Sequence, residues 1–264
     1  MMNPCTWKRV LHCATFLLVG LLLGSCGGKK LVLDPKTKSD SELYQMGQDF
    51  MKTKDYEKAR DAFRVVFDNF PKSDYRILAK LGIADSYFQE GSITNYILAT
   101  QEYQDFISLF PFSPKACYAQ LQIGMCYFKQ VEKPDRDQTN SRKALEEYRK
   151  VVDNYPDCEH YREAYDYLLK CYSRLAEHEY VIAHFYQRTG KPQAAVDRLK
   201  GILKAYPEPV LQPKFYFALG RSLQELQQFS ESCSYYGILL EKWPNSEFTN
   251  DAKESSSKVC KQSS

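Results

Sequence analysis

The sequence predicts an all-α protein, a superhelical solenoid of about five helical hairpins. Apolar residues recur at helical spacing through most of the chain after residue 40. Small residues occupy matching places in these segments, where two helices could approach each other closely. Proline ends a helix and biases its predecessor away from helical angles. Aromatic–proline pairs close five of the segments: Phe70-Pro71, Phe110-Pro111, Tyr155-Pro156, Tyr206-Pro207 and Trp243-Pro244.

Residues 1–25 are predicted to be a lipoprotein signal peptide. Two basic residues precede an apolar run over residues 10–23, which is short for a membrane span, and Leu23-Gly24-Ser25-Cys26 follows it. Small residues before a cysteine suit the peptidase that cuts lipoproteins, so we expect lipidation at Cys26. An ordinary signal peptide that contains a cysteine is the alternative. Residues 26–40 read as a flexible tether. Gly27 differs from the Asp that resembles an inner-membrane retention signal, and the tether carries no acidic run that resembles a surface-export signal. We therefore expect the protein on the periplasmic face of the outer membrane, and the cell surface remains open.

The first hairpin, residues 43–71, supplies the template. Leu43, Met46, Gly47 and Phe50 share one stripe, and Ala59, Phe63 and Val66 share another. These are the spacings of the tetratricopeptide repeat. Ser41, with Glu42 beside it, is the expected start of the first helix.

Two further hairpins complete the N-terminal repeats, residues 41–156. In the second, Asp85 stands where the repeat prefers glycine, and the turn at Gly91-Ser92 is about two residues longer than the template. The third contains a polar insertion over residues 132–141. An insertion in a solenoid lies on its edge, so we expect this loop to face solvent, either as a connector or as a contact for a partner.

The C-terminal repeats, residues 157–264, begin with one long helix over about 161–188 or two nearly collinear ones. A return helix follows from Pro192 towards Pro207. The fifth hairpin spans about 216–244 and matches the template without insertion. A helical tail over about 248–259 is expected to cap the stack, and residues 261–264 to fray.

Composition and motifs argue against an enzyme and against nucleic acid. Removal of Lys8 and Arg9 with the signal leaves 34 basic against 33 acidic residues, too even a balance for a nucleic-acid protein. No metal, cofactor or nucleophile motif is present in the sequence. His160, His178 and His184 are expected to be surface or packing residues. The 20 tyrosines and 15 phenylalanines could line a sugar-binding surface, but helical spacing favours the core.

Six cysteines remain after the lipidated one, and their pairing stays open at this point. None forms a Cys-x-x-Cys motif, so neither a redox couple nor a zinc ribbon is indicated. Cys126 and Cys171 occupy similar places in successive repeats and read as small core residues, with a bridge as the minority interpretation. The others are Cys117, Cys158, Cys233 and Cys260.

Residues beyond the repeat consensus carry a resemblance over essentially the whole mature chain. The run 175–190 reads LAEHEYVIAHFYQRTG, and the run 194–207 reads AAVDRLKGILKAYP; the sequence DRDQ at 135–138 adds to them. Together with the lipoprotein box, these motifs resemble the BamD family of outer-membrane assembly lipoproteins. The second repeat and the cysteine content depart from better-known members, which leaves accessory subunits open.

The resemblance implies a non-enzymatic subunit of the machinery that inserts β-barrel proteins into the outer membrane, with no cofactor. Its C-terminal repeats would dock on the periplasmic domains of a BamA-like barrel subunit. The corresponding residues here are Arg198, Arg188, Lys200, Glu179 and Tyr180. Arg198 would meet an acidic residue of that subunit, unless it is an ordinary exposed helix residue. Unfolded outer-membrane clients would bind an N-terminal groove around Tyr44, Phe88 and Tyr96.

Other interpretations remain. A surface or periplasmic tetratricopeptide lipoprotein could instead capture glycans, although no substrate subdomain is inserted between the repeats. Another envelope-complex scaffold would fit the same pattern. An enzyme lacks any supporting motif.

Overall fold

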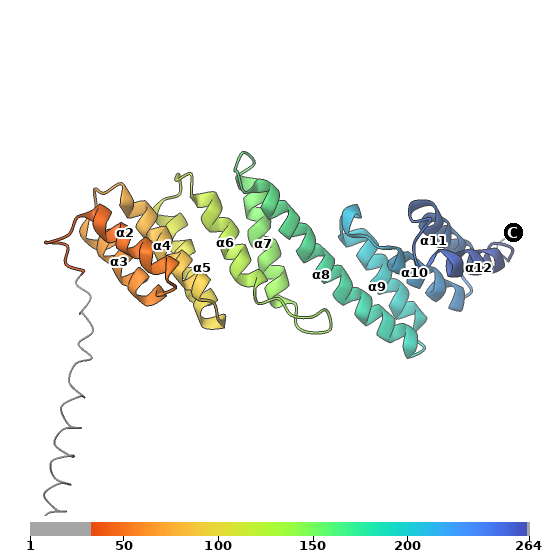
Figure 1. Ribbon diagram of the computed structural model, residues 1–264. Coiled ribbons are helices and arrows are strands. Elements are labelled where there is room, and N and C mark those ends of the chain that lie inside the picture. Colours follow the sequence, from red (N-terminus) through yellow and green to blue (C-terminus); the bar gives the residue numbers. More distant parts are fainter. Residues whose placement is uncertain (1–32, 263–264) are drawn as a thin grey trace, which may run out of the picture.

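The computed structural model describes residues 33–262, and these residues form helices without a strand (Figure 1). The signal peptide and Cys26 lie outside them. Eleven α-helices and one 3₁₀ helix occur in order: α2 Asp40–Lys52, α3 Tyr56–Asn69, α4 Tyr75–Glu90, α5 Ile93–Leu109, α6 Ala116–Phe128, α7 Thr139–Asn154, α8 Tyr161–Arg188, α9 Pro192–Ala205, η1 Glu208–Val210, α10 Pro213–Glu225, α11 Phe229–Lys242 and α12 Thr249–Val259.

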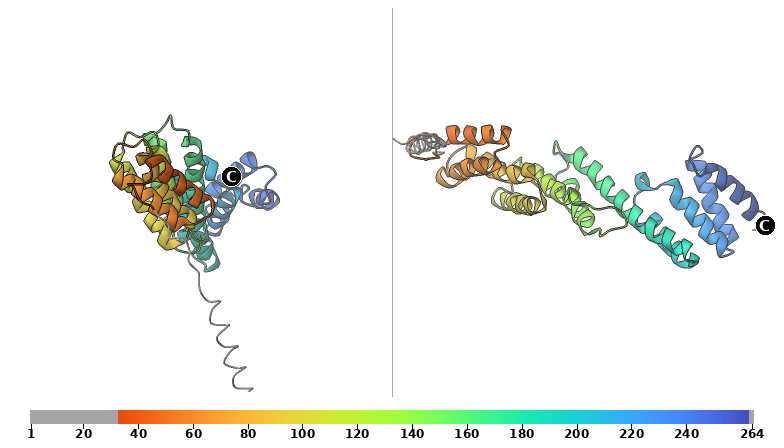
Figure 2. Two further views of the ribbon diagram at one scale, coloured as in Figure 1. Left: turned by 60° about the vertical axis from the view of Figure 1, so that its left-hand side comes forward. Right: turned by 60° about the horizontal axis from the view of Figure 1, so that its bottom comes forward.

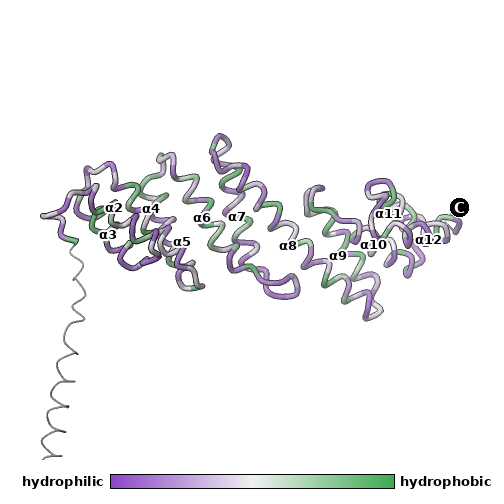
Figure 3. The backbone as a smooth tube through the Cα atoms, in the orientation of Figure 1, coloured by the Kyte–Doolittle hydropathy of each residue, from purple (hydrophilic) through white to green (hydrophobic). Residues whose placement is uncertain are grey.

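The α-helices stack as antiparallel neighbours in a long row, which turns gradually along its length (Figures 1 and 2). Five hairpins are present, α2–α3, α4–α5, α6–α7, α8–α9 and α10–α11, and α12 packs on α11 at the C-terminal end. The predicted solenoid is therefore confirmed. The predicted aromatic–proline stops fall at the ends of α3, α5, α7, α9 and α11. In Figure 3 the loops along both edges of the row are largely hydrophilic.

In the first, third and fifth hairpins, a glycine on the first helix meets a large aromatic ring on the second. Phe63 of α3 fills the space beside Gly47 of α2 and Gly82 of α4, where an added Cβ would lie 2.5 and 2.8 Å from its ring. Gly124 has the same relation to Tyr148, and Gly220 to Tyr236. Phe63, Tyr148 and Tyr236 are completely buried. Close approach at a small residue therefore sets the spacing of the helices.

The first helix begins two residues before the predicted start, because Ser39 and not Ser41 is the N-cap. The Ser39 hydroxyl accepts a hydrogen bond from the Glu42 backbone N–H (3.2 Å), and Glu42 Oε2 accepts one from the Ser39 backbone N–H (2.8 Å). This reciprocal capping box fixes the start of α2 at Asp40. A hydrogen-bonded turn over residues 34–38 precedes it, so the described end of the predicted tether is ordered.

The insertion between α6 and α7 is a structured loop at the edge of the row. Its residues at 132, 133 and 135–137 are exposed, as expected. Gln138 is the exception, with only 1% of its surface exposed. Its amide nitrogen donates to the carbonyl oxygens of Lys133 (2.8 Å) and Arg136 (3.0 Å), which closes the loop on itself. His178 Nδ1 of α8 donates to the Pro134 carbonyl oxygen (2.5 Å), so the loop is also tied to the next hairpin.

Helix α8 is a single helix of 28 residues that belongs to two parts of the core. Ala164, Leu168 and Cys171, in its first half, pack with residues of α6 and α7. Ala176 and Ala183, in its second half, pack with α9 and α10. The first half of α8 therefore packs against the third repeat, and the same continuous helix serves as the first helix of the fourth repeat.

Two disulfides brace the stack, one in its middle and one at its C-terminal end. Cys117 at the start of α6 bonds to Cys158 in the turn before α8, and Cys233 of α11 bonds to Cys260 after α12. The second bond fixes the capping helix to the hairpin that it covers. Cys126 and Cys171 are free and buried, which confirms the core interpretation of both.

The contact between Gly124 and Tyr148 predicts a position-specific cost for an added methyl group. In the Gly124→Ala variant the new Cβ would lie 2.6 Å from Tyr148 Cε1, so the free energy of unfolding should fall by about 1–3 kcal/mol. Gly237→Ala is the matched control, because no atom lies within 4 Å of its Cβ position and alanine favours a helix by about 1 kcal/mol. Urea unfolding of both variants measures the difference. Equal stability of the two variants would contradict the interlocking account.

Candidate binding surfaces

The predicted docking residues at the C-terminal end include one ion pair within the chain. Arg198 Nη1 of α9 lies 2.8 Å from Glu179 Oε2 of α8. This hydrogen bond raises the pKa of the Arg198 guanidinium, and 45% of the Arg198 side chain is still exposed. Arg198 is therefore not an exposed residue without a partner. A guanidinium has five N–H donors, so this one can engage a second carboxylate while it holds Glu179.

The structure distributes the other three predicted docking residues over different environments. Lys200 pairs with Glu231 of α11 (2.7 Å), and this bond raises the pKa of Lys200. Arg188 is exposed at the end of α8. Tyr180 is partly buried and packs on Phe215 of α10, with a ring-centroid distance of 5.5 Å. Tyr180 therefore contributes to the core of this region more than to its surface.

An apolar stripe on α8 was missed by the sequence analysis. Val181 and Phe185 are one turn apart, with 39% and 58% of their surfaces exposed. Helical spacing places them on a different face from Glu179. In a helix with one core face, helical periodicity would have shown Val181 and Phe185 as apolar residues outside that face. Helix α8 has different core faces in its two halves, and this obscures the signal.

In the N-terminal repeats, Tyr44 lies apart from the other two predicted groove residues. Its ring on α2 packs on Tyr75 and Phe63, with centroid distances of 5.0 and 5.6 Å. Its hydroxyl accepts a hydrogen bond from Gln48 Nε2 (3.1 Å). Burial raises the pKa of Tyr44. Tyr44 belongs to the cluster of the first repeat and remains partly exposed.

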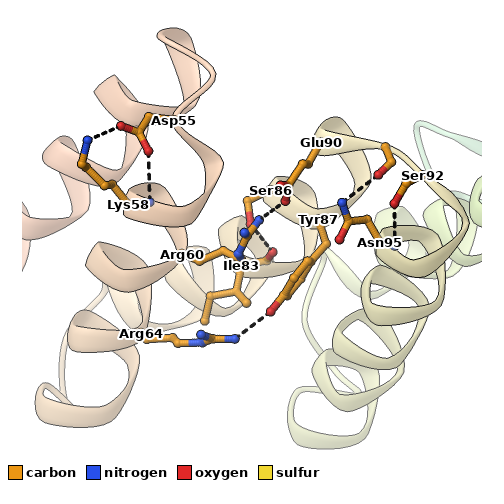
Figure 4. Close-up of polar contacts among 11 residues, drawn as sticks. Asp55, Lys58, Arg60, Arg64, Ile83, Ser86, Tyr87, Glu90, Ser92 and Asn95 are labelled. Carbon is orange, nitrogen blue, oxygen red and sulfur yellow. Dashed lines mark hydrogen bonds and ion pairs between the residues drawn. The ribbon is translucent and has the colours of Figure 1, made fainter.

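Phe88 and Tyr96 lie together, one on each helix of the second hairpin, with a centroid distance of 5.8 Å. They flank the turn that contains Gly91 and Ser92, where Asn95 donates its side-chain N–H to the Gly91 carbonyl oxygen (2.7 Å). Nearby, Arg60 of α3 pairs with Glu90 of α4 (2.6 Å). Figure 4 shows that this ion pair joins the first repeat to the second. This end of the second hairpin is therefore well ordered.

Asp85 occupies the glycine position of the second hairpin, and two tyrosine hydroxyls donate hydrogen bonds to its buried carboxyl group. Tyr103 of α5 donates to Asp85 Oδ1 (2.6 Å), and Tyr118 of α6 donates to the same oxygen (3.0 Å). Three helices from two repeats meet at this carboxyl group. Burial raises its pKa to about 6, although both hydroxyls act in the opposite direction. Burial, followed by the charge of Asp85, also raises the pKa of both tyrosines.

The described part of the chain contains no cluster of three or more His, Cys, Asp or Glu residues that could hold a metal ion. Among the same residues, no helix is both long enough and apolar enough to cross a membrane.

The matched families agree with the fold. Residues 36–218 match a family described as an outer membrane lipoprotein family, YfiO, and residues 215–246 match a tetratricopeptide repeat. The first match covers well over half of the chain. The chain belongs to the YfiO family of outer membrane lipoproteins. Its expected non-enzymatic character is supported by this membership and by the names of curated relatives.

Those relatives are modest in identity and broad in coverage. Outer membrane protein assembly factor BamD of Caulobacter vibrioides is 29% identical over 77% of this chain, and the alignment spans 66% of that protein. BamD of Rickettsia prowazekii is 26% identical over 89% of this chain and 92% of its own length. Among solved structures, the TPR2AB domain of yeast Sti1 with an Hsp90 peptide has a TM-score of 0.45 at 18% identity, covering 83% of this chain and 82% of that one.

The buried carboxyl of Asp85 predicts a pH-dependent stability. Its folded-state pKa of about 6 exceeds the ordinary value of 3.8, so its favourable contribution is complete below pH 3.8 and is lost as the pH rises through 6. Asp85→Asn keeps an oxygen acceptor and cannot ionise. Relative to wild type, the variant should therefore gain up to about 3 kcal/mol between pH 4 and 7. Urea unfolding across this range tests it, with the exposed Asp61→Asn as control. A stability difference that does not change with pH would contradict the assignment.

Proposed function

We propose that this chain is a non-enzymatic scaffold of the outer-membrane β-barrel assembly machinery, which helps to fold and insert outer-membrane β-barrel proteins. The observation that carries the proposal is its membership in an outer membrane lipoprotein family whose curated relatives are outer membrane protein assembly factors. The fold supports it, because a stack of hairpins presents long surfaces for other polypeptides.

The chain is proposed to be anchored through acylated Cys26 and to face the periplasm. The lipoprotein box at residues 23–26 supports the anchor. The two disulfides support the orientation, because such bonds persist in oxidising compartments such as the periplasm. Oxidation would join α6 of the third repeat to the turn before α8 through Cys117 and Cys158, and would fix the cap through Cys233 and Cys260.

The C-terminal repeats are proposed to bind the periplasmic domains of a BamA-like barrel subunit. The half-exposed guanidinium of Arg198 supports this, because it is held in place by Glu179 and retains further donors for a carboxylate of the partner. Lys200 lies two residues away on the same helix, where Glu231 positions it in a similar way. Preorganised cations lose less side-chain freedom on binding than freely rotating ones.

The N-terminal repeats are proposed to hold extended segments of unfolded outer-membrane clients. Tyr44 supports this, because its ring is supported by Tyr75 and Phe63 but remains partly exposed. Phe88 and Tyr96 would contact the client beside the turn between α4 and α5. They form a patch separate from Tyr44.

The experiment that tests the docking proposal is co-purification of the barrel subunit with Arg198→Glu. Charge reversal should reduce recovery at least tenfold, because the guanidinium contact becomes a repulsion, while circular dichroism shows unchanged helix content. Arg162→Glu is the control, since this arginine is also on the surface and 83% of its side chain is exposed. Partners recovered from detergent extracts are identified by mass spectrometry.

Unchanged recovery of the barrel subunit with Arg198→Glu would remove the docking role of that residue. Wild-type protein that recovers only glycan-capture or unrelated envelope proteins would overturn the assembly function itself.

A further inference from the structure

The turns that join successive repeats lie along one edge of the row, the upper edge in Figure 1, and the start of α2 lies on the same edge. A hydrogen bond from the Ser73 side chain, in the turn at residues 70–74, lowers the pKa of Asp40 at the start of α2. The Arg76 guanidinium, just beyond this turn, lies 5.8 Å from the centroid of the Phe110 ring. The start of α2 and the turns at residues 70–74 and 110–115 are therefore neighbours, and together we call them the tether edge.

Exposed apolar side chains gather on the tether edge. Phe112, in the turn at residues 110–115, has 98% of its surface exposed, the highest value among the large apolar residues that the structure describes as exposed. Leu109, the last residue of α5, is 53% exposed. Ile77 and Leu78, in the first turn of α4, are each 36% exposed on the same edge. Contiguous apolar surface of this kind marks a place where a protein contacts a partner or a membrane.

The turn that carries Phe112 is ordered. The Ser113 backbone N–H donates to the Phe110 carbonyl oxygen (3.0 Å), and the Ala116 backbone N–H donates to the Ser113 carbonyl oxygen (2.9 Å). Proline on either side, at positions 111 and 114, restricts the backbone further. The Phe112 ring is therefore held outside the core by its turn, where water surrounds it in the isolated chain.

The proposed acyl anchor keeps this part of the molecule close to lipid. Leu33, the first described residue, packs on the cluster of the first repeat. Seven peptide links join it to Cys26, and they can span at most about 25 Å. The first repeat therefore stays within that distance of the membrane surface, with the second repeat packed beside it.

The chain between the anchor and α2 is basic. Residues 27–39 contain one acidic residue, Asp34, and four lysines: Lys29, Lys30, Lys36 and Lys38. Basic residues beside a lipid anchor are attracted to anionic headgroups, and they strengthen a contact that apolar side chains also make. Charge and exposed apolar surface therefore favour the same neighbour at this end of the molecule.

Farther along the row, the same edge is acidic. The turn at residues 155–160 exposes Asp157 and Glu159, and η1 exposes Glu208. Anionic headgroups would repel these carboxylates. Lipid contact is therefore expected at the first two repeats only, which leaves the C-terminal repeats free for the barrel subunit.

We infer that the tether edge lies on the lipid surface, with the side chains of Phe112 and Leu109 inserted among the headgroups. The inference deepens the proposed function and rests on its anchor at Cys26. The acyl group keeps the chain at the membrane, and Phe112 determines which edge of the row faces it. A second attachment point fixes the orientation that a flexible tether alone would leave free.

A lipid surface fits the tether edge better than a protein partner does. A stable protein interface buries about 800 Å² on each partner and has a well-packed apolar centre. Here one ring projects from a turn, and the other apolar side chains lie at the ends of two helices. Phenylalanine and leucine beside a basic segment are typical of shallow insertion at a membrane interface.

The test couples the mature chain through the Cys26 thiol to a maleimide lipid in vesicles of phosphatidylethanolamine and phosphatidylglycerol. Cys126 and Cys171, the free cysteines of the described chain, are buried and should not react. Trp243→Phe removes the one tryptophan outside the signal peptide. In this background, Phe112→Trp places a fluorescent probe on the tether edge. Asp135→Trp is the matched control, because it places the probe in the exposed loop at the opposite end of α6.

Coupling to vesicles should shift the emission of the Phe112→Trp variant to shorter wavelength, and lipids with brominated acyl chains should quench it at least twofold. The Asp135→Trp variant should keep the emission that it has in solution. Circular dichroism checks that both variants retain the helix content of the unsubstituted chain.

Two results would overturn the inference. Emission of Phe112→Trp that is neither shifted nor quenched would leave the ring in water, as expected if it contacts a protein instead. Equal quenching of the two variants would show that no edge is preferred. Chemical coupling makes both results independent of acylation in the cell. The mass of the natural mature protein tests that acyl group separately, so a missing anchor and a missing lipid contact are distinguishable.

Discussion

The structure depends on one unbroken helix that two repeats share. The core face of α8 changes along its length, from the side of Ala164 and Leu168, which meets α7, to the side of Ala176 and Ala183, which meets α9. Because a helix is stiff, this shared element fixes the C-terminal hairpins relative to the N-terminal ones. The position of Glu179, which holds Arg198, depends on it.

Within the first, third and fifth hairpins, helix spacing is set by how closely a glycine lets a ring approach. The second repeat shows what replaces that contact. Asp85 brings a carboxyl group to a place where the first, third and fifth repeats have glycine, and Tyr103 and Tyr118 supply the hydroxyl donors that make its burial tolerable. A polar group with two specified partners restricts how α4, α5 and α6 can pack, because any other arrangement would leave it unsatisfied.

The sequence was sufficient to predict the hairpins, their order and the cap, since each follows from local spacing and from proline stops. It left open whether residues 161–188 form one helix or two, and the structure shows one. It also placed Asp85 at the glycine position. It could not predict the pairing of Cys117 with Cys158, because they are 41 positions apart in the sequence and only the stacking of repeats brings the start of α6 next to the turn before α8. The internal partner of Arg198 was hidden for the same reason: Glu179 lies on another helix.

The candidate surfaces show the same limit. Tyr44, Phe88 and Tyr96 were grouped by the family resemblance, but the structure places Tyr44 in a different cluster from the other two.

Hydrogen exchange of the α8 backbone amides between Cys171 and Ala176 tests the central claim most directly, because these amides lie where the packing changes from α7 to α9. One continuous helix predicts that they exchange as slowly as those of Leu168 and Ala183. Exchange at the rate of the exposed α6–α7 loop would show a hinge there and contradict a fixed arrangement of the two halves.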